Sequence, residues 1–225
     1  MATILCLETA TTNCSVALGV NGQVKSLVEE NSPNYSHSEQ LHVFMEEALA
    51  KASVSIQDLD AIAVSKGPGS YTGLRIGVSA AKGLCFSLGI PLISIPTLKS
   101  MATQIQLHSN EVVISLLDAR RMEVYSCAFD SRHVALSDTK AEIVTEDSFE
   151  EYKGFQNIHL IGSGATKCKG VLTDDIFEFH PDIVPSAKEI VILAEEQYLS
   201  SAFEDVAYFE PYYLKDFVLQ GRKKA

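Results

Sequence analysis

The sequence SKGPGSYTGLRIGVSAAKGL, at residues 65–84, joins a short apolar run to a long segment rich in glycine and alanine. The apolar run, Ala61–Val64, is typical of a buried strand, and the glycines that follow tolerate positive φ in a turn. Thr72 then provides a hydroxyl that can cap a helix. The stretch therefore predicts a strand, a glycine turn and a helix, and it indicates an α/β fold.

The spacing of the glycines does not match the common phosphate-binding motifs. Gly67, Gly69 and Gly73 read GxGxxxG, whereas a Walker loop requires GxxxxGK[ST] and a dinucleotide fingerprint requires GxGxxG. Free N–H groups in the first turn of the helix can serve a phosphate or simply a capping hydroxyl. As a nucleotide motif, this stretch is weak.

Small residues recur at every fourth position of the predicted helix, and an apolar stripe lies beside them. Glycine inside a helix costs about 0.5–1 kcal/mol relative to alanine, which indicates a closely packed partner. That partner is either the chain's own sheet or another subunit, and periodicity does not distinguish the two. The residues of this surface are Gly73, Leu74, Gly77, Val78, Ala81, Cys85 and Leu88.

The composition is that of an acidic folded protein of 225 residues, with 46% hydrophobic residues and a formal net charge of -11. This charge argues against the chain gripping nucleic acid alone, because such affinity comes from neutralising phosphates with Lys and Arg. Five cysteines without CxxC spacing predict reduced thiols, which suits a cytoplasmic location. No targeting signal is recognised, and no apolar run approaches the roughly 20 residues of a membrane span.

Hydrophobic patterning predicts an N-terminal lobe at residues 1–99, a smaller lobe at 100–207 and a C-terminal segment at 208–225 that packs back on the first lobe. A hairpin is expected at Asn21–Gly22, and Ser36 with Glu39 forms a capping box for a helix. The strands are predicted at 4–7, 15–20, 23–28, 61–64, 92–95, 112–117, 123–129 and 158–161. Helices are predicted at 36–52, from 72 onward, at 97–107 and 145–152, shortly after 162–165, and at 186–199.

Two loops are candidates for a nucleotide site. Glu8 and Thr9 open the hydroxyl-rich turn ETATTNCS, where a carboxylate could hold Mg²⁺ through water and hydroxyls could meet phosphate. Gly162 and Gly164 form a second glycine turn. The commoner interpretation is that such side chains satisfy the turn's own backbone.

A charged turn and the histidines complete the candidates. Asp118, Arg120, Arg121 and Glu123 lie between two predicted strands, as either a solvated turn or an ion-pair network that positions a partner. His37 and His42 lack the spacing of a metallopeptidase, so no metal site is predicted. The remaining histidines are scattered and read as surface or satisfied residues: His108, His133, His159 and His180. Ser163 lies outside any GxSxG elbow, and no residue is predicted to be catalytic.

The sequence resembles the TsaB family, also called YeaZ, the smaller bacterial partner in making threonylcarbamoyladenosine on tRNA. The resemblance spans the whole chain and is strongest in the glycine stretch combined with DARRMEVY. The matching segments are ILCLETATTNCSVAL (4–18), SKGPGSYTGLRIGVSAAKGL (65–84), DARRMEVY (118–125), GSGA (162–165) and EPYYLK (210–215).

The resemblance implies an actin-like ATPase (ASKHA) fold with two lobes of mixed sheet flanked by helices. It also implies a non-catalytic role, because the TsaD paralogue carries a metal-binding HxxxH on the helix corresponding to 36–52, where this chain has His37 and His42. The nucleotide pattern is altered as well. Glu8 replaces the Asp of actin-like enzymes, and Asp118-Ala119-Arg120 replaces Asp-x-Gly of the second phosphate loop.

The function implied is an accessory subunit of a TsaD-type transferase, with a TsaE-type ATPase driving turnover. ATP and Mg²⁺ would be bound mainly by the partners, and tRNA would be held indirectly through the complex. The chain would bind the TsaD paralogue through the first two helices of its N-terminal lobe, and in isolation it would form a homodimer through the same surface. No membrane partner is expected. The interface residues expected are Gly73, Leu74, Gly77, Val78, Ala81 and Cys85. The alternatives are a stand-alone actin-like ATPase or kinase, a glycoprotease-like peptidase, and a purely homodimeric scaffold.

Overall fold

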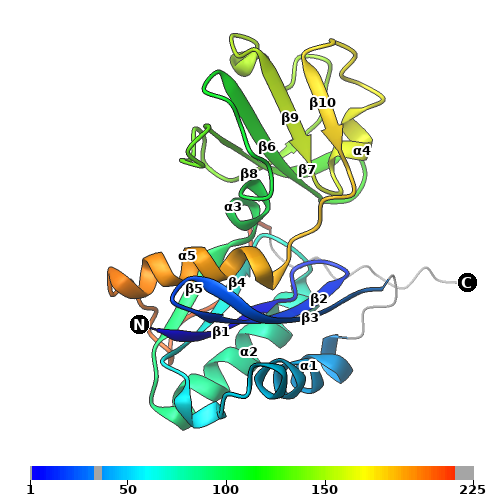
Figure 1. Cartoon of the computed structure of the whole chain (residues 1–225). Coiled ribbons are helices and arrows are strands. Elements are labelled where there is room, and N and C mark those ends of the chain that lie inside the picture. The colour runs from blue at the N-terminus through cyan, green and yellow to red at the C-terminus, as the bar shows by residue number, and fades with distance from the viewer. Residues whose placement is uncertain (1, 33–36, 216–225) are drawn as a thin grey trace, which may run out of the picture.

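A computed structural model describes residues 2–32 and 37–215 of the chain and shows two lobes, each built on a five-stranded mixed sheet (Figure 1). Ser36, half of the predicted capping box, lies outside the described residues. The predicted α/β architecture of two lobes with mixed sheets and flanking helices is confirmed.

The first sheet has the order β3-β2-β1-β4-β5, with β1, β4 and β5 parallel and β2 and β3 antiparallel additions. Its central strands are buried on both faces, so they read as continuous apolar runs. Helices α1 and α2 cover one face, and α5 covers the other (Figure 1). The elements are β1 (Thr3–Glu8), β2 (Asn13–Val20), β3 (Gln23–Asn31), α1 (His37–Ala52), β4 (Ala61–Gly67), α2 (Tyr71–Leu88), β5 (Leu92–Pro96) and α5 (Ala187–Leu199).

The second sheet repeats this topology in the order β10-β9-β6-β7-β8. Its strands are β6 (Glu111–Asp118), β7 (Glu123–Phe129), β8 (Lys140–Ile143), β9 (Asn157–Ile161) and β10 (Phe177–His180). Helix α3 (Thr97–Ala102) packs on one face and α4 (Ala165–Cys168) on the other. Single 3-10 turns, η1 and η2, lie at Ile56–Asp58 and Glu150–Tyr152.

The eight predicted strands and the hairpin are confirmed. The hairpin turn has φ of 54° at Asn21 and 70° at Gly22, as an Asn-Gly turn of this type requires. Two short strands, β8 and β10, were not predicted. The helix predicted at 97–107 ends at Ala102, and the helix predicted at 145–152 is only the 3-10 turn at its end.

The predicted lobe boundaries are wrong in two places. Helix α3 spans the boundary at 99/100 and packs on the second sheet with Val113 and Cys127. Helix α5 lies in the segment predicted for the second lobe, yet Ile190 and Val191 pack on the first sheet. The reason is that the first sheet is apolar on both faces and needs a second cover, whereas sequence order does not show which sheet a later helix will cover.

Helix α2 begins one residue earlier than predicted. Ser70 rather than Thr72 is the N-cap, since its hydroxyl accepts a hydrogen bond from the Gly73 N–H at 3.3 Å. Gly89 ends the helix in the left-handed conformation with φ of 68°.

The small-residue surface of α2 packs inside the chain. A Cβ atom at Gly73 would lie 2.1 Å from the carbonyl oxygen of Thr9, and one at Gly77 would lie 2.3 Å from the Thr9 hydroxyl. The prediction that this surface contacts another subunit directly is therefore wrong, because the chain's own β1–β2 turn occupies the space. All six predicted interface residues are buried: Gly73, Leu74, Gly77, Val78, Ala81 and Cys85.

Two glycines of α2 should respond oppositely to alanine. At Gly77 the new methyl would displace the Thr9 hydroxyl, so we expect Gly77→Ala to lower the free energy of unfolding by about 1–3 kcal/mol. At Gly83 nothing lies within 4 Å of the new atom, so Gly83→Ala should raise it by about 0.4–1 kcal/mol. Urea unfolding followed by circular dichroism measures both, and equal effects at the two sites would contradict this packing of α2.

Candidate functional site between the two lobes

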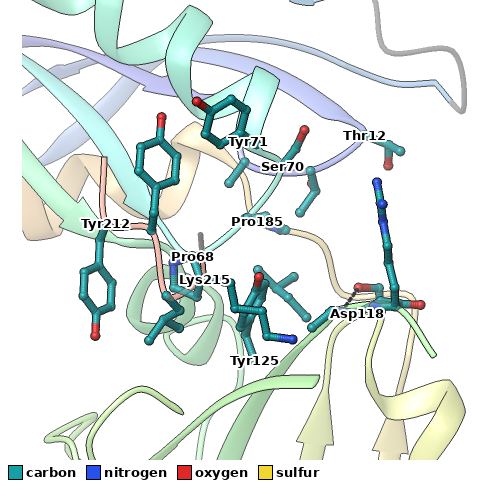
Figure 2. A pocket seen from close by; sticks show the side chains of 18 of the residues that line it. Thr12, Pro68, Ser70, Tyr71, Asp118, Tyr125, Pro185, Tyr212 and Lys215 are labelled. Atoms are coloured by element: carbon teal, nitrogen blue, oxygen red, sulfur yellow. Dashed lines mark hydrogen bonds between the residues drawn. The ribbon is translucent and has the colours of Figure 1, made fainter. Parts of the chain in front are cut away.

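A cavity of about 680 Å³ lies between the lobes, and separate segments of the chain line it (Figure 2). Figure 2 shows Thr12 and Ser70 of the first lobe on one side and Asp118 and Tyr125 of the second lobe on the other. The lining residues come from the β1–β2 turn (10–12), the start of α2 (68–72), the second lobe (117–120, 125 and 163), the connection before α5 (183–185) and the C-terminal segment (212–215).

The β1–β2 turn is fastened to the start of α2. The Thr9 hydroxyl donates to the carbonyl oxygen of Gly73 at 2.8 Å, and the Ser70 N–H donates to the carbonyl oxygen of Ala10 at 2.7 Å. A Cβ at Gly69 would lie 2.5 Å from that same Ala10 oxygen, so only glycine permits this approach. Thr9 is therefore a packing residue, whereas Thr11 and Thr12 line the cavity.

Glu8 is fully buried and does not line the cavity. One carboxylate oxygen, Oε1, accepts from the Ala10 N–H at 2.6 Å and from the Ser65 hydroxyl at 2.7 Å, while Oε2 has no hydrogen-bond partner. Burial raises the pKa of Glu8 to about 7, because the charged form loses its hydration. The carboxylate bridges the ends of β1 and β4 rather than meeting a cation in the cavity.

The charged turn joins β6 to β7 and is held by lysines from elsewhere. Asp118 accepts from the Lys167 ammonium at 2.7 Å, and Glu123 pairs with Lys215 of the C-terminal segment. Arg120 and Arg121 lie at the surface, and both have left-handed backbones with φ of 71° and 51°. This backbone conformation favours glycine, so the turn is strained at both arginines. Their side chains are exposed to solvent.

Gly162 and Gly164 pack against β6 instead of facing a ligand. A Cβ at Gly162, where φ is 94°, would lie 2.4 Å from the carbonyl oxygen of Leu116, and one at Gly164 would lie 2.8 Å from the Leu116 Cβ. Ser163 between them lines the cavity, and its hydroxyl accepts from the Asp118 N–H at 3.1 Å. Of the four residues predicted for a nucleotide site, Glu8, Thr9, Gly162 and Gly164, none lines the cavity.

The loops around the cavity use only some of their backbone N–H groups within the chain, whereas an actin-like ATPase binds its triphosphate with free loop N–H groups. The N–H groups of Thr11, Thr12, Gly69 and Thr72 line the cavity without an acceptor among the described residues, while Glu8, the acid predicted to hold Mg²⁺, is buried and does not line the cavity. The buried Glu8 therefore does not fit a Mg²⁺ site in this cavity. The N–H groups in use are those of Ala10, Asn13, Ser70, Gly73, Asp118, Ala119, Arg120 and Gly164.

The described part of the C-terminal segment closes one end of the cavity and contacts both lobes. The Tyr212 N–H donates to the carbonyl oxygen of Lys66 at 2.7 Å, and the Tyr213 ring lies 4.9 Å from that of Tyr71. Lys215 reaches Glu123 in the second lobe. The packing of this segment on the first lobe was predicted, whereas its contact with Glu123 of the second lobe and its place at the cavity were not.

The histidines fall into separate environments. His37 is buried at the start of α1, with a ring nitrogen 2.7 Å from the carbonyl oxygen of Thr11, and His42 is exposed. His159 and His180 are not scattered as predicted, because the pairing of β9 with β10 brings them together beside Glu178. That cluster is the one set of side chains in the described part of the chain with the arrangement of metal ligands.

Comparison with known proteins gives a consistent picture. The model of the TsaD family, tRNA N6-adenosine threonylcarbamoyltransferase, matches residues 32–221. The chain is 30% identical to the tRNA threonylcarbamoyladenosine biosynthesis protein TsaB of Haemophilus influenzae, covering 98% of both chains, and 28% identical to that of Escherichia coli, covering 96% of this chain and 95% of the relative.

A solved structure of YeaZ from Pseudomonas aeruginosa is 25% identical and superposes with a TM-score of 0.84, covering 95% of this chain and all of that one. This likeness confirms the predicted fold class. Among the helices in the described ranges, none combines the length and apolar character needed to cross a membrane.

Glu8 should make stability depend on pH. Between pH 4.5 and about 7 the folded chain keeps a proton that the unfolded chain releases, so the Glu8 contribution to the free energy of unfolding falls as pH rises through this window. The neutral variant Glu8→Gln removes that loss. We expect it to gain up to about 3 kcal/mol over the parent chain between pH 4.5 and 8.

Urea unfolding at several pH values measures this gain, and the exposed Glu46→Gln on α1 is the matched control. A constant difference between Glu8→Gln and the parent across the range would contradict the burial of a titrating carboxyl.

Proposed function

Because the chain belongs to the TsaB (YeaZ) family of tRNA threonylcarbamoyladenosine biosynthesis proteins, we propose that it is a non-catalytic subunit that binds and supports a TsaD-type transferase. The observation that carries the proposal is the burial of Glu8. One oxygen of this acid bonds to the Ala10 N–H and the Ser65 hydroxyl, and Glu8 does not line the cavity, which therefore lacks the carboxylate predicted to hold Mg²⁺ for a nucleotide.

The proposed docking site is the outer side of the first two helices, which we call the outer α1/α2 surface: Val43, Ile76, Ala80, Gly83 and Phe86. Phe86 is 86% exposed and Val43 is 56% exposed. At Gly83, no atom of the described chain lies within 4 Å of an added Cβ, so the surface is open there. Exposed apolar side chains on two adjacent helices favour burial by a partner, since clustered exposure of this kind marks interaction sites.

The partner proposed for this surface is of the TsaD type, because the TsaD family model matches most of this chain and indicates that the two proteins share a fold. Two chains of one fold can pair through equivalent faces, and a second copy of this chain can use the same surface in a homodimer. The homodimer and the heterodimer then exclude one another.

The remaining chemistry is assigned to the partners. The net charge of -11 opposes contact with phosphate, so tRNA is held by another subunit of the complex. ATP and Mg²⁺ are bound by the partners, with a TsaE-type ATPase driving turnover. This chain contributes the outer α1/α2 surface, through which it binds and supports the transferase.

Charged substitutions on the outer α1/α2 surface should weaken the heterodimer. We expect Phe86→Asp and Gly83→Arg to raise the dissociation constant of the complex with the TsaD-type transferase at least about tenfold, because an unpaired charge would be buried. Leu199→Asp is the matched control, since Leu199 is 73% exposed on α5 at the opposite face of the same sheet (Figure 1).

Isothermal titration calorimetry measures the binding, and circular dichroism verifies that each variant is folded. The assignment of the surface fails if Leu199→Asp weakens the complex as much as Phe86→Asp does.

Reconstitution of the modification tests the function as a whole. With tRNA, ATP, Mg²⁺, the partner enzymes and their substrates present, omission of this chain should abolish or greatly reduce threonylcarbamoyladenosine, measured by mass spectrometry of tRNA nucleosides. The purified chain alone should hydrolyse ATP no faster than a Glu8→Ala variant. Robust ATPase or peptidase activity of the folded chain alone, lost in Glu8→Ala, would instead support a stand-alone enzyme.

A further inference from the structure

Three polar side chains converge on the edge of the second sheet, where β9 and β10 run parallel with Glu178 opposite His159 in the register. Neighbouring residues of a strand point to opposite faces. Ile158 and Phe177 face the apolar cluster that α4 covers, so His159, Glu178 and His180 share the other face. None of the three belongs to the residues that line the inter-lobe cavity.

The distances between the potential ligand atoms are those of a metal site. His159 Nδ1 lies 3.3 Å from His180 Nε2 and 3.4 Å from Glu178 Oε2, and the last two atoms lie 3.9 Å apart. Ligands bound at about 2.0–2.1 Å with tetrahedral angles lie about 3.3–3.4 Å from one another. Two of the three separations already match, and the third needs only a small movement of the half-exposed Glu178 side chain.

A second carboxylate stands where it would orient the buried histidine. His159 Nε2 has no hydrogen-bond partner although the residue is only 9% exposed, and it points to Glu111 Oε2 at 3.5 Å. Glu111 is itself fixed by the His108 N–H at 2.8 Å and by the Asn157 amide at 3.2 Å. A metal-bound histidine commonly donates its second ring N–H to a carboxylate in this way.

An ordinary polar network explains less of this arrangement. One hydrogen bond between the two rings uses a single proton, and it leaves Glu178 Oε2 with only long approaches of 3.4 Å to His159 Nδ1 and 3.9 Å to His180 Nε2. It also leaves the buried His159 Nε2 unpaired. A cation among the three ligand atoms would satisfy all of them together.

We propose that His159, Glu178 and His180 bind a divalent transition-metal ion of the Zn²⁺ type, with Glu111 as the residue that positions His159. Two imidazoles and one carboxylate suit Zn²⁺, whereas Mg²⁺ and Ca²⁺ prefer oxygen ligands throughout. The part-exposed His180 and Glu178 leave room for water as a fourth ligand. The ion ties the four-residue edge strand β10 to β9 (Figure 1).

Metal titration of the full chain, after treatment with a chelator, tests the proposal. Isothermal titration calorimetry with Zn²⁺ should show one ion bound, and Co²⁺ should give the visible absorption of a tetrahedral site without a thiolate band. His180→Ala and Glu178→Gln change part-exposed side chains, so both variants should fold. We expect each to weaken binding at least about tenfold, and Glu111→Gln to weaken it by about 10–100-fold.

His42→Ala is the matched control, because it removes an exposed histidine from the other lobe and should leave binding unchanged. Zn²⁺ should also raise the melting temperature of the parent and of His42→Ala, but not that of His180→Ala. The proposal is overturned if the parent shows no saturable binding, or if His180→Ala and Glu178→Gln bind Zn²⁺ as tightly as the parent. A Co²⁺ spectrum dominated by thiolate bands would also overturn it by assigning the ion to cysteines.

Discussion

The contact between the β1–β2 turn and helix α2 is the constraint on which the rest of the first lobe depends. The carbonyl oxygen and the hydroxyl of Thr9 both occupy space that any side chain at Gly73 or Gly77 would fill. The turn is thereby pressed onto the helix, and the Thr9 hydroxyl secures it by bonding to the Gly73 carbonyl. Because well-packed interiors deform little, this close contact fixes the position of the β1–β2 turn relative to α2.

The same contact determines what the cavity can do. The turn covers the Glu8 carboxyl, and this burial favours its neutral form. The Ala10 N–H donates its hydrogen bond to the same carboxyl. The second lobe follows the same plan, since Gly162 and Gly164 bring their turn against Leu116. Both glycine turns thus serve backbone packing. Their glycine content therefore does not by itself indicate a phosphate site, because the close packing of the backbone already requires glycine at these positions.

The sequence predicts much of the fold because the signals are local. Buried strands such as Ala61–Val64 are continuous apolar runs, and Asn21–Gly22 has the chemistry of one hairpin turn. Periodicity also predicts that α2 has a bare face, but it contains no information about which element fills that face. The same limit applies to α5, whose apolar stripe is visible in the sequence, whereas the sheet on which it packs is not.

The candidate sites were harder to predict, because each depends on contacts between distant segments. His159 and His180 are 21 residues apart and meet only because β10 pairs with β9.

The packing of α2 also explains why its outer side is the part left for a partner. Once Gly73, Gly77 and the adjoining apolar residues are buried, the helix has met its own need for a hydrophobic core. An additional Phe86 at 86% exposure adds nothing to the stability of the chain alone, since its apolar surface stays in water. A second molecule that covers Phe86 gains that burial without disturbing the glycine contact beneath. In the proposed complex, recognition and folding would use opposite sides of one helix, with the outer side binding the partner while the inner side holds the lobe together.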